Sequence, residues 1–415
     1  MRLLFVCNAF YNMGNIQIAS WIEGIVNTIP CEDQVIILAP NNQKRVNRLS
    51  GYNTHFLDRN VKYYSSDGYN VEENARIILK EENPDVIIIF GTEFRFSYDA
   101  LLAAEKEKVL DKAVIFAQGF SSVCGRHYAE GLPNGLLKRK SFRDFLRGDS
   151  IALQIKKFNE CAETENKILK LTHNMIGRTT MDYSLLHQCN DSAKYFKCND
   201  ILRDCFYAGE WSYEHCHKHS ILVSQYYYPL KGFHYLLEAV SIVKEKYPDV
   251  SVVAAGYNPI GSDIKKRSIK DSSYIIYLRK LAKKYDVEEN LSFVGILNAQ
   301  EMKEEYLKSN VFVLPSTIEN SPNSLAEAMY LGVPSIAADV GGVSDFAEHK
   351  KEAFLYPSSA SYLLAYYIMD IFEHAEKAIK MGIAGRERAK KEYNKEKNGK
   401  RFLEIIECIA NIGEV

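Results

Sequence analysis

The strongest constraint on the fold is a repeated alternation of short apolar runs with segments of helical periodicity. In the first half of the chain the runs lie at residues 2–7, 35–38, 85–90, 113–117 and near 175. A second series begins at residues 221, 250, 291, 311 and 335. Strands that alternate with helices predict a mainly parallel, doubly wound sheet, and two successive series predict two such sheets. We therefore expect an α/β chain with two similar Rossmann-like domains.

The segment between the two series predicts the domain boundary. Residues 206–220 (FYAGEWSYEHCHKHS) are polar, aromatic and rich in histidine, with neither a strand pattern nor a long helical period. Beyond residue 360 the pattern is helical to the end of the chain. We expect a first domain over 1–205, a linker over 206–220, a second domain over 221–390 and a C-terminal helix over 391–415.

Composition excludes several classes of protein. The 415 residues, 47% of them apolar, suffice for two or three packed domains, and the formal net charge of -1 gives no global reason to expect nucleic acid. Nine cysteines without a C-x-x-C pair or a secretory signal favour reduced thiols in a cytosol. Since no apolar run approaches the roughly 18 residues of a membrane span, we expect a cytoplasmic protein, soluble or peripheral at the inner face of the membrane.

A metal site is not expected. Residues 189–217 hold four cysteines and two histidines, but gaps of nine and seven residues between the first three cysteines do not match the short ligand spacings of structural zinc sites. The chain also has no Asp-x-Asp, a motif through which some enzymes bind a divalent ion to a diphosphate. We therefore expect no metal and no cofactor.

Residues 311–345 carry the clearest functional pattern. They predict a strand, a loop ending at Glu319, a helix that Ser321 can cap and Pro322 can open, and a second acid, Glu327, inside that helix. A helix N-terminus offers unpaired N–H groups and partial positive charge to a phosphate, while carboxylates suit the hydroxyls of a sugar or ribose. Phosphate and polyol together indicate a nucleotide sugar. The alternative is an ordinary strand-helix-strand unit with two solvated acids.

The same segment resembles a known signature. The pattern P-S-x-x-E-x-x-P-N-S-L-x-E-A-M-x-x-G-V-P is similar to the donor site of retaining family 4 glycosyltransferases, which belong to glycosyl transferases group 1. This resemblance implies a GT-B fold, in which two Rossmann-like domains face a central cleft and C-terminal helices cross back to the first domain. It also implies that Glu319 contacts the transferred sugar and that Glu327 accepts hydrogen bonds from the ribose. The phosphate would lie near the N–H groups of Ser324 and Leu325. Three further donor-binding candidates in the segment are Asn320, Ser321 and Asn323.

Lys231 is the candidate cation for the leaving diphosphate. It lies with Gly232 between the first strand of the second domain and an amphipathic helix, where a fixed ammonium would stabilise the charge that develops as the glycosidic bond breaks. A solvated lysine at a helix start is the alternative. The family usually carries an arginine five residues earlier, where this chain has Tyr226, which donates a hydrogen bond but adds no charge. Either Arg178 or Arg203 replaces that base, or the phosphate is held differently.

Further candidates follow strand ends in the first domain. Gly14 lies in the loop after the first strand, where the absence of a Cβ lets backbone approach a phosphate or sugar, although turn chemistry also explains it. Gln118 follows the strand at 113–117; relatives often have a histidine there that contacts the sugar, and glutamine cannot act as a general base. His127 either faces the acceptor or lies on the surface.

Two more residues complete the donor-binding set. Arg178 follows the strand near residue 175 and suits phosphate or acceptor recognition, or else forms a buried ion pair with Asp182 or Glu165. Leu297 lies where relatives hold the nucleobase by backbone contacts. Because ligands bind outside the carboxyl ends of strands in open α/β sheets, we expect these positions to meet in the interdomain cleft.

A basic amphipathic stretch covers residues 136–147 (LLKRKSFRDFLR). Basic side chains beside an anionic leaflet and inserted aromatic rings predict transient contact with a membrane surface. The alternative is a solvated helix whose apolar side faces the core.

These patterns predict a glycosyltransferase that moves a hexose-type sugar, with retention, from a UDP- or GDP-sugar to a saccharide or lipid-linked acceptor, in cell-surface polysaccharide biosynthesis. Two alternatives stay open: a nucleotide-sugar epimerase of the same fold, and a non-catalytic protein that binds sugar nucleotides.

Overall fold

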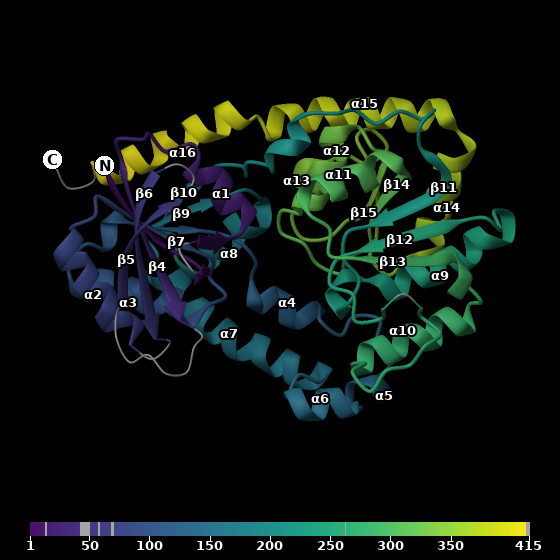
Figure 1. Ribbon diagram of the computed structural model, residues 1–415, viewed down its shortest axis with the longest axis horizontal. Coiled ribbons are helices and arrows are strands. Elements are labelled where there is room, and N and C mark those ends of the chain that lie inside the picture. The colour runs from purple at the N-terminus through teal and green to yellow at the C-terminus, as the bar shows by residue number, and fades with distance from the viewer. Residues whose placement is uncertain (13–14, 42–49, 57–58, 68–69, 262, 412–415) are drawn as a thin grey trace. The chain divides into compact units, whose positions relative to one another are not determined.

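The computed structural model describes residues 1–12, 15–41, 50–56, 59–67, 70–261 and 263–411 (Figure 1). The chain divides into two compact units. The first unit comprises Met1–Ser122, Asn159–Ile201 and Tyr393–Val415, and the second comprises Val123–Phe158 and Leu202–Glu392.

The first unit is built on a sheet that is parallel except at one edge. Among the described residues the sheet has eight strands in the order β10-β9-β8-β7-β1-β4-β6-β5, and only the edge pair of β5 and β6 is antiparallel. Its strands are β1 (Arg2–Val6), β4 (Gln34–Asn41), β5 (Ser50–Phe56), β6 (Arg59–Asp67), β7 (Val86–Phe90), β8 (Ala113–Phe116), β9 (Asn174–Gly177) and β10 (Lys194–Lys197). A separate hairpin joins β2 (Ala9–Asn12) to β3 (Asn15–Ile18). Central strands such as β7 are buried along their whole length, as expected for a parallel sheet covered on both faces.

The helices of the first unit have apolar faces directed at this sheet. They are α1 (Ser20–Val26), α2 (Val71–Glu82), α3 (Arg95–Lys106), α8 (Thr180–Cys189) and α16 (Lys395–Ala410), with a short turn η1 (Leu110–Lys112). On α16 the buried residues Phe402, Ile405, Ile406 and Ile409 follow the spacing of one helix face, and they belong to the same core as β1 and β7. The C-terminal helix is therefore part of the first unit. Both units take residues from α4 (Ser121–His127) and α7 (Ile151–Leu171).

The second unit contains an entirely parallel sheet. Its described residues form six strands in the order β13-β12-β11-β14-β15-β16. These are β11 (His217–Val223), β12 (Ser251–Ala255), β13 (Leu291–Gly295), β14 (Ser309–Leu314), β15 (Ser335–Ala338) and β16 (Phe354–Tyr356). The chain runs outward from β11 to β13 on one side and from β14 to β16 on the other. The strand order therefore reverses between β11 and β14, and ligands in open α/β sheets bind at such a switch point.

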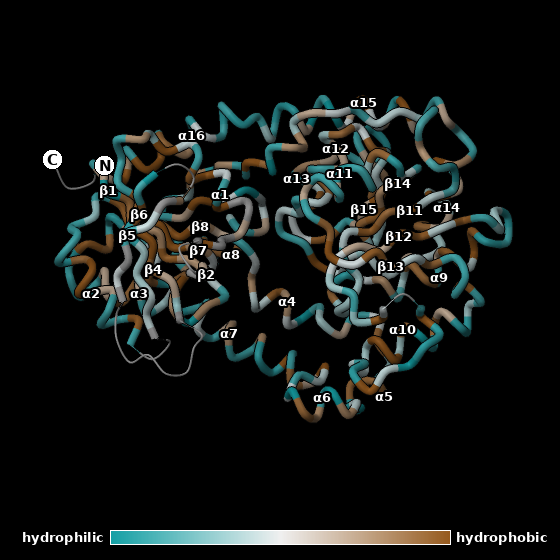
Figure 2. The backbone as a smooth tube through the Cα atoms, in the orientation of Figure 1, coloured by the Kyte–Doolittle hydropathy of each residue, from teal (hydrophilic) through white to brown (hydrophobic). Residues whose placement is uncertain are grey.

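Helices cover the second sheet in two groups. In one group α9 packs with α10 and α14, and in the other α12 packs with α15 and η2. The helices are α5 (Asn134–Leu137), α6 (Phe142–Arg147), α9 (Phe233–Lys246), α10 (Ser273–Lys284), α11 (Ala299–Lys308), α12 (Asn323–Leu331), α13 (Val343–Phe346), α14 (Ser361–Glu373) and α15 (Ala375–Glu392). Short 3₁₀ turns are η2 (Asp204–Tyr207), η3 (Pro229–Lys231) and η4 (Glu288–Asn290). Figure 2 shows hydrophobic residues concentrated in the central strands of each sheet.

The predicted α/β architecture with two doubly wound sheets is confirmed, and each apolar run of the two series coincides with a strand. The predicted boundaries differ from the observed division in two places. Residues 123–158, assigned to the first domain, belong to the second unit, because Tyr128, Leu132, Leu136 and Ile151 join its hydrophobic core. The segment 206–220, predicted to lack strands, already contains the first residues of β11 from His217 onward.

No helix in the described part of the chain is both long enough and apolar enough to cross a membrane.

Candidate functional site

The switch point of the second sheet brings Lys231 and Glu319 together. Lys231 ends the turn η3 that follows β11, and Glu319 lies in the loop that follows the neighbouring strand β14. The Lys231 Nζ lies 2.5 Å from Glu319 Oε1, and the two side chains are only 18% and 13% exposed. Two residues 88 positions apart in the sequence thus form one charged pair at the carboxyl ends of adjacent strands.

A close backbone approach holds this pair in place. Gly232 has φ +61°, and a Cβ there would lie 2.7 Å from the carbonyl carbon of Pro315. Two residues after Pro315, the N–H of Thr317 donates to the carbonyl of Leu230 at 2.8 Å. Because only glycine accommodates both the left-handed conformation and the contact, it lets the loops after β11 and β14 pack backbone against backbone.

The pair keeps Lys231 charged. Burial alone would lower the pKa of Lys231, but the charge of Glu319 outweighs it and the pKa is raised. Burial raises the pKa of the neighbouring Tyr228 to about 12, so that phenol is neutral at pH 7. The Ser316 hydroxyl donates to Glu319 Oε1 at 2.7 Å. The site therefore presents a fixed ammonium and a carboxylate held by two partners.

The start of α12 differs from the predicted cap. The helix begins at Asn323 with Pro322 as the N-cap residue, and no side chain makes a capping hydrogen bond. The prediction that Ser321 caps the helix is wrong, because Pro322 occupies the cap position with an extended backbone (φ -75°, ψ 103°). The N–H of Leu325 donates to the Pro322 carbonyl at 3.0 Å, so the predicted phosphate donor at Leu325 has a backbone partner here. The backbone N–H groups of Asn323 and Ser324 lie before the first hydrogen bond within the helix, so they have no partner inside it.

Two polar atoms beside this helix start are buried without a partner. Neither Ser321 Oγ nor Asn323 Oδ1 has a hydrogen-bond partner among the described residues. Buried polar groups in native proteins are nearly always satisfied, so these two atoms are available to hydrogen-bond a ligand or water. Asn320, the third polar residue of the loop, is 7% exposed. The loop and the first turn of α12 thus have the polar groups that an anionic, hydroxylated ligand needs.

The second acid of the signature, Glu327, is buried and already paired. Arg203 Nε and Nη2 each donate to one of its oxygens at 2.8 Å. Burial raises the pKa of Glu327, and the guanidinium of Arg203 opposes that rise. From the sequence, Arg203 was considered only as a substitute for the missing phosphate-binding arginine. Its pairing with Glu327 could not be seen there, because the two residues are 124 positions apart.

Tyr226, at the position where the family usually has an arginine, lies in the core. Its ring is fully buried between Phe233 and Phe293, and its hydroxyl is 2.5 Å from Asn258 Oδ1. This tyrosine therefore does not replace the arginine as a phosphate ligand. Leu297 is partly exposed in the loop between β13 and α11.

The predicted residues of the first unit have different outcomes. Arg178 is 3% exposed and forms a buried ion pair with Asp200, and its guanidinium also donates to the carbonyl of Ala117. That Arg178 recognises phosphate or acceptor stays a prediction. The alternative of a buried ion pair is right, although the partner is Asp200 and Asp182 instead accepts from the Arg178 backbone N–H at 2.9 Å.

Three other residues were predicted to follow strand ends of the first domain: Gly14, Gln118 and His127. Gln118 follows β8 in the first unit and is partly buried. Gly14 lies outside the described residues. His127, in the second unit, has its Nδ1 2.7 Å from a carboxylate oxygen of Glu130 and a side chain 38% exposed, which fits the surface alternative.

Two acids that sequence reasoning did not assign to a functional site lie close together in the first unit. Glu93 follows β7, and its carboxyl group folds over Gly91, where a Cβ would lie 2.8 Å from the carboxyl carbon. Glu93 Oε2 is buried without a partner among the described residues. Burial, and then the charge of Glu165, raise the pKa of Glu93 to about 7. Glu165 itself accepts hydrogen bonds from Ser121 N–H at 2.7 Å and from the Ser122 hydroxyl at 2.5 Å. The tripeptide Gly-Thr-Glu at a strand end was the available signal.

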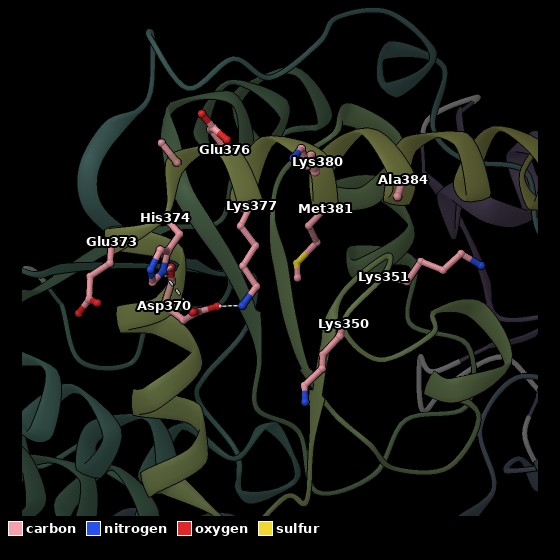
Figure 3. A pocket seen from close by; sticks show the side chains of 11 residues that line it. Lys350, Lys351, Asp370, Glu373, His374, Glu376, Lys377, Lys380, Met381 and Ala384 are labelled. Atoms are coloured by element: carbon pink, nitrogen blue, oxygen red, sulfur yellow. Dashed lines mark hydrogen bonds and ion pairs between the residues drawn. The ribbon is translucent and has the colours of Figure 1, made fainter.

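A separate surface hollow of the second unit lies along α14 and α15 (Figure 3). Its lining is mixed in charge: Lys377 points toward Asp370 at 2.5 Å, while Lys350 comes from the loop before β16. The hollow contains none of the predicted donor-site residues. Within the described residues, no three histidine, cysteine, aspartate or glutamate side chains gather as they would around a metal ion.

The fold defines the class of protein first. Sucrose-phosphate synthase from Thermosynechococcus elongatus superimposes with a TM-score of 0.71 at 14% identity, covering 98% of both chains. HepE from Anabaena, solved in complex with UDP-glucose, gives a TM-score of 0.66 at 14% identity, covering 98% of this chain and 100% of that one. Together with the two parallel sheets, these neighbours establish a GT-B fold.

The sequence comparisons then narrow the class. Residues 217–388 match the family of glycosyl transferases group 1. An uncharacterised glycosyltransferase of Haemophilus influenzae is 31% identical over 137 residues, 33% of this chain and 34% of that protein. The amylovoran biosynthesis glycosyltransferase of Erwinia amylovora is 24% identical over 186 residues, 43% and 42% of the two chains. The matches thus span less than half of each relative. Over residues 217–388 the chain is therefore similar to glycosyl transferases of group 1.

Proposed function

We propose that this protein is a retaining glycosyltransferase of family 4 that transfers a hexose-type sugar from a nucleotide-diphosphate sugar. The observation that carries the proposal is the Lys231–Glu319 pair at the switch point. Beside it lie two buried polar atoms without a partner among the described residues, one on Ser321 in the loop after β14 and one on Asn323 at the start of α12. Relatives and neighbours favour UDP or GDP: the HepE structure holds UDP-glucose, and a mannosyltransferase of Mycobacterium tuberculosis, 25% identical over 166 residues, is GDP-mannose-dependent.

The proposed reaction replaces one bond to the anomeric carbon by another. The bond from that carbon to the diphosphate oxygen breaks, an acceptor hydroxyl forms the new bond on the same face, and its proton passes to the leaving phosphate. The Lys231 ammonium and the amides at the start of α12 stabilise the negative charge that grows on the diphosphate. We propose that these groups do this without a metal ion and that no cofactor takes part.

The two acids divide the hydroxyl groups between them. Glu319, paired with Lys231, accepts hydrogen bonds from the transferred sugar, and Glu327, four residues inside α12, accepts them from the ribose. Asn320, Ser321 and Asn323 complete the donor site. In this proposal the second unit holds the donor, and the first unit holds a saccharide or lipid-linked acceptor for a cell-surface polysaccharide, on the cytoplasmic side of the membrane. The predicted contact of Gln118 with the donor sugar stays a prediction.

The structure adds support for membrane contact, through a patch that we name the α6 surface: Lys138, Arg139, Lys140, Phe142, Phe145, Leu146 and Arg147. Phe142, Phe145 and Leu146 are 58%, 72% and 67% exposed, so these apolar groups do not face the core as the alternative required. The four basic residues of the patch are exposed as well. Each contributes about 1 kcal/mol beside an anionic leaflet. We propose transient docking of this surface on anionic lipid.

Vesicle sedimentation tests the docking surface. The protein should bind vesicles that contain phosphatidylglycerol but not pure phosphatidylcholine vesicles, and Phe145→Ser with Leu146→Ser should weaken binding at least tenfold. Tyr362→Ser is the matched control, since Tyr362 is equally exposed, at 67%, but lies on α14. Equal binding to both vesicle types, or unchanged binding by the double variant, contradicts docking through this surface.

A single assay tests the reaction against its alternatives. The protein is incubated with UDP-, GDP-, dTDP- and ADP-sugars, with and without membrane lipid extract, while free nucleotide and sugar epimers are followed. Release of nucleoside diphosphate that depends on the extract supports glycosyl transfer. An epimerase would interconvert the donor without any acceptor, and a binding protein would consume nothing; either result contradicts the proposal.

A further inference from the structure

The Arg203–Glu327 pair gives the donor site a feature that the Glu-x7-Glu pattern does not contain. Arg203 donates through two different nitrogens to the two oxygens of Glu327, and both distances are 2.8 Å. Such a bidentate contact fixes the plane of a carboxylate as well as its position. The side chain of Glu327 is 7% exposed and that of Arg203 is 26% exposed, so the pair is reachable from one side.

We propose that Arg203 is a positioning residue for nucleoside recognition. It keeps the buried Glu327 ionised and oriented, so that the remaining lone pairs of the carboxylate accept hydrogen bonds from the two ribose hydroxyls of the bound nucleotide. This inference rests on the proposed function and adds to it a residue that determines how the ribose is read.

The electrostatics of Glu327 depend on this partner. Burial raises the pKa of Glu327, and the hydrogen bonds and charge of Arg203 hold it down. The other titratable groups around Glu327 are the phenol of Tyr306 on α11 and the thiol of Cys205, and burial raises the pKa of both. Both groups are therefore neutral near pH 7. Arg203 is the only cation among the groups that act on Glu327 in the described part of the chain, and its removal would let the carboxyl protonate at a higher pH.

The surroundings also tie Arg203 to the start of α12. Its guanidinium lies 4.7 Å from the centre of the Phe206 ring, and Phe206 packs edge-on against Tyr306. The Tyr306 hydroxyl donates to the carbonyl of Ser324, in the first turn of α12, at 2.9 Å. The aromatic pair Phe206 and Tyr306 therefore contacts both Arg203, which orients the proposed ribose ligand, and the start of α12, where we propose that the phosphate binds.

A different role for Arg203 would be direct contact with the diphosphate, in place of the arginine missing at position 226. To reach a phosphate with its fork, Arg203 would have to release both oxygens of Glu327. That movement would leave a buried carboxylate without its counterion, which is strongly unfavourable. The geometry therefore favours ribose recognition over phosphate binding.

Calorimetric binding tests this inference with UDP, GDP and ADP, continued with the nucleotide that wild type binds best. Each affinity is taken relative to wild type at the same pH, between pH 8.5 and 6, because the terminal phosphate of a nucleoside diphosphate itself titrates in this range. Affinity of Arg203→Gln should fall about tenfold or more over the same range, because a protonated Glu327 no longer accepts from the ribose. Arg203→Lys, which keeps the charge, should stay flat with pH, and Arg203→Gln/Glu327→Gln should lose the pH dependence.

Inorganic pyrophosphate, which has no ribose, separates the two roles of Arg203. It should bind wild type and Arg203→Gln equally well. Arg386→Gln is the matched control: Arg386 on α15 pairs with Glu210 at the surface of the same unit, and its loss should leave nucleotide binding unchanged. Thermal melting of each variant shows whether it is folded.

Three results would overturn the inference. Arg203→Gln could weaken nucleotide binding equally at every pH, as a purely structural role predicts, or not weaken it at all. It could also abolish pyrophosphate binding, as a phosphate ligand would. If wild type binds none of the three nucleotides, the proposed function fails and this inference fails with it; binding by wild type with a flat Arg203→Gln profile defeats this inference alone.

Discussion

Replacing Glu93 by glutamine should stabilise the first unit relative to wild type, and this gain in the free energy of unfolding should be larger at high pH than at low pH. The pKa of Glu93 is raised to about 7, first by burial and then by the charge of Glu165, while Arg178 lowers it. In the unfolded chain a glutamate carboxyl has a pKa near 4.5. A raised carboxyl pKa means that the folded state favours the neutral acid. Its contribution to stability is therefore complete below pH 4.5 and is lost as pH rises through 7.

The size of the effect follows from the two pKa values. Each unit of difference corresponds to about 1.4 kcal/mol, so ionising Glu93 in the folded state costs at most about 3 kcal/mol above pH 7. Glu93→Gln removes this titration. Any change in contacts that the amide causes is the same at all pH values and cancels when the variant is compared with itself across the range.

Urea unfolding between pH 4.5 and 9 measures this difference. In a Trp211→Phe background the fluorescence of Trp21, which belongs to the first unit, reports on that unit alone. The free energy of unfolding of Glu93→Gln, minus that of its parent, should increase by about 2 to 3 kcal/mol from low to high pH. Glu105→Gln, at an exposed position of α3, is the control and should show no trend. A difference that stays constant with pH, or that falls, refutes the reasoning.

Three further predictions concern the donor site and the core. Lys231→Ala and Glu319→Ala should each lower turnover about a hundredfold or more without unfolding the protein, the scale of losing one preorganised electrostatic group, and near-normal turnover in both purified variants would contradict their roles. Gly232→Ala should destabilise the second unit by about 2 kcal/mol or more in urea unfolding, through left-handed strain and the Pro315 contact, and a neutral effect would show that the loops move apart freely. Arg178→Met should cost about 3 to 5 kcal/mol because it leaves Asp200 buried and unpaired, whereas an effect below about 1 kcal/mol would mean that this ion pair is not required.

The sequence predicted the sheets well for a physical reason. Strands of a parallel sheet are covered on both faces, so they appear as short, continuous apolar runs such as VIIIF in β7 and VFVL in β14. The edge strand β10 is less buried and carries a weaker pattern. This is why β10, with its exposed Lys194 and Lys197, was not found.

Two of the predicted donor-site residues lie together, as expected, where neighbours in sequence determine the geometry. Glu319 and Lys231 each follow a central strand directly, so adjacency of β11 and β14 is enough to bring them together. The contacts that sequence reasoning missed depend on long-range pairing. Nothing local to Arg178 reveals that Asp200 lies beside it, and nothing local to Glu327 reveals Arg203.

The assignment of Tyr226 shows a further limit of sequence reasoning. From the sequence, a tyrosine at a position where relatives have a phosphate-binding arginine shows only that a charge is missing there. In the structure its ring fills the core between Phe233 and Phe293, and its hydroxyl is satisfied by Asn258. Burial, which depends on the packing of several elements, decided the role of this residue.

A crystal structure of the protein with a bound UDP- or GDP-sugar tests the central claim most directly. We predict that the diphosphate lies within hydrogen-bond distance of Lys231 Nζ and of the amides at the start of α12, with Glu319 on the sugar and Glu327 on the ribose. A nucleotide bound elsewhere, for example in the hollow between Lys350 and Lys377, with the Lys231–Glu319 pair unchanged, would contradict the account.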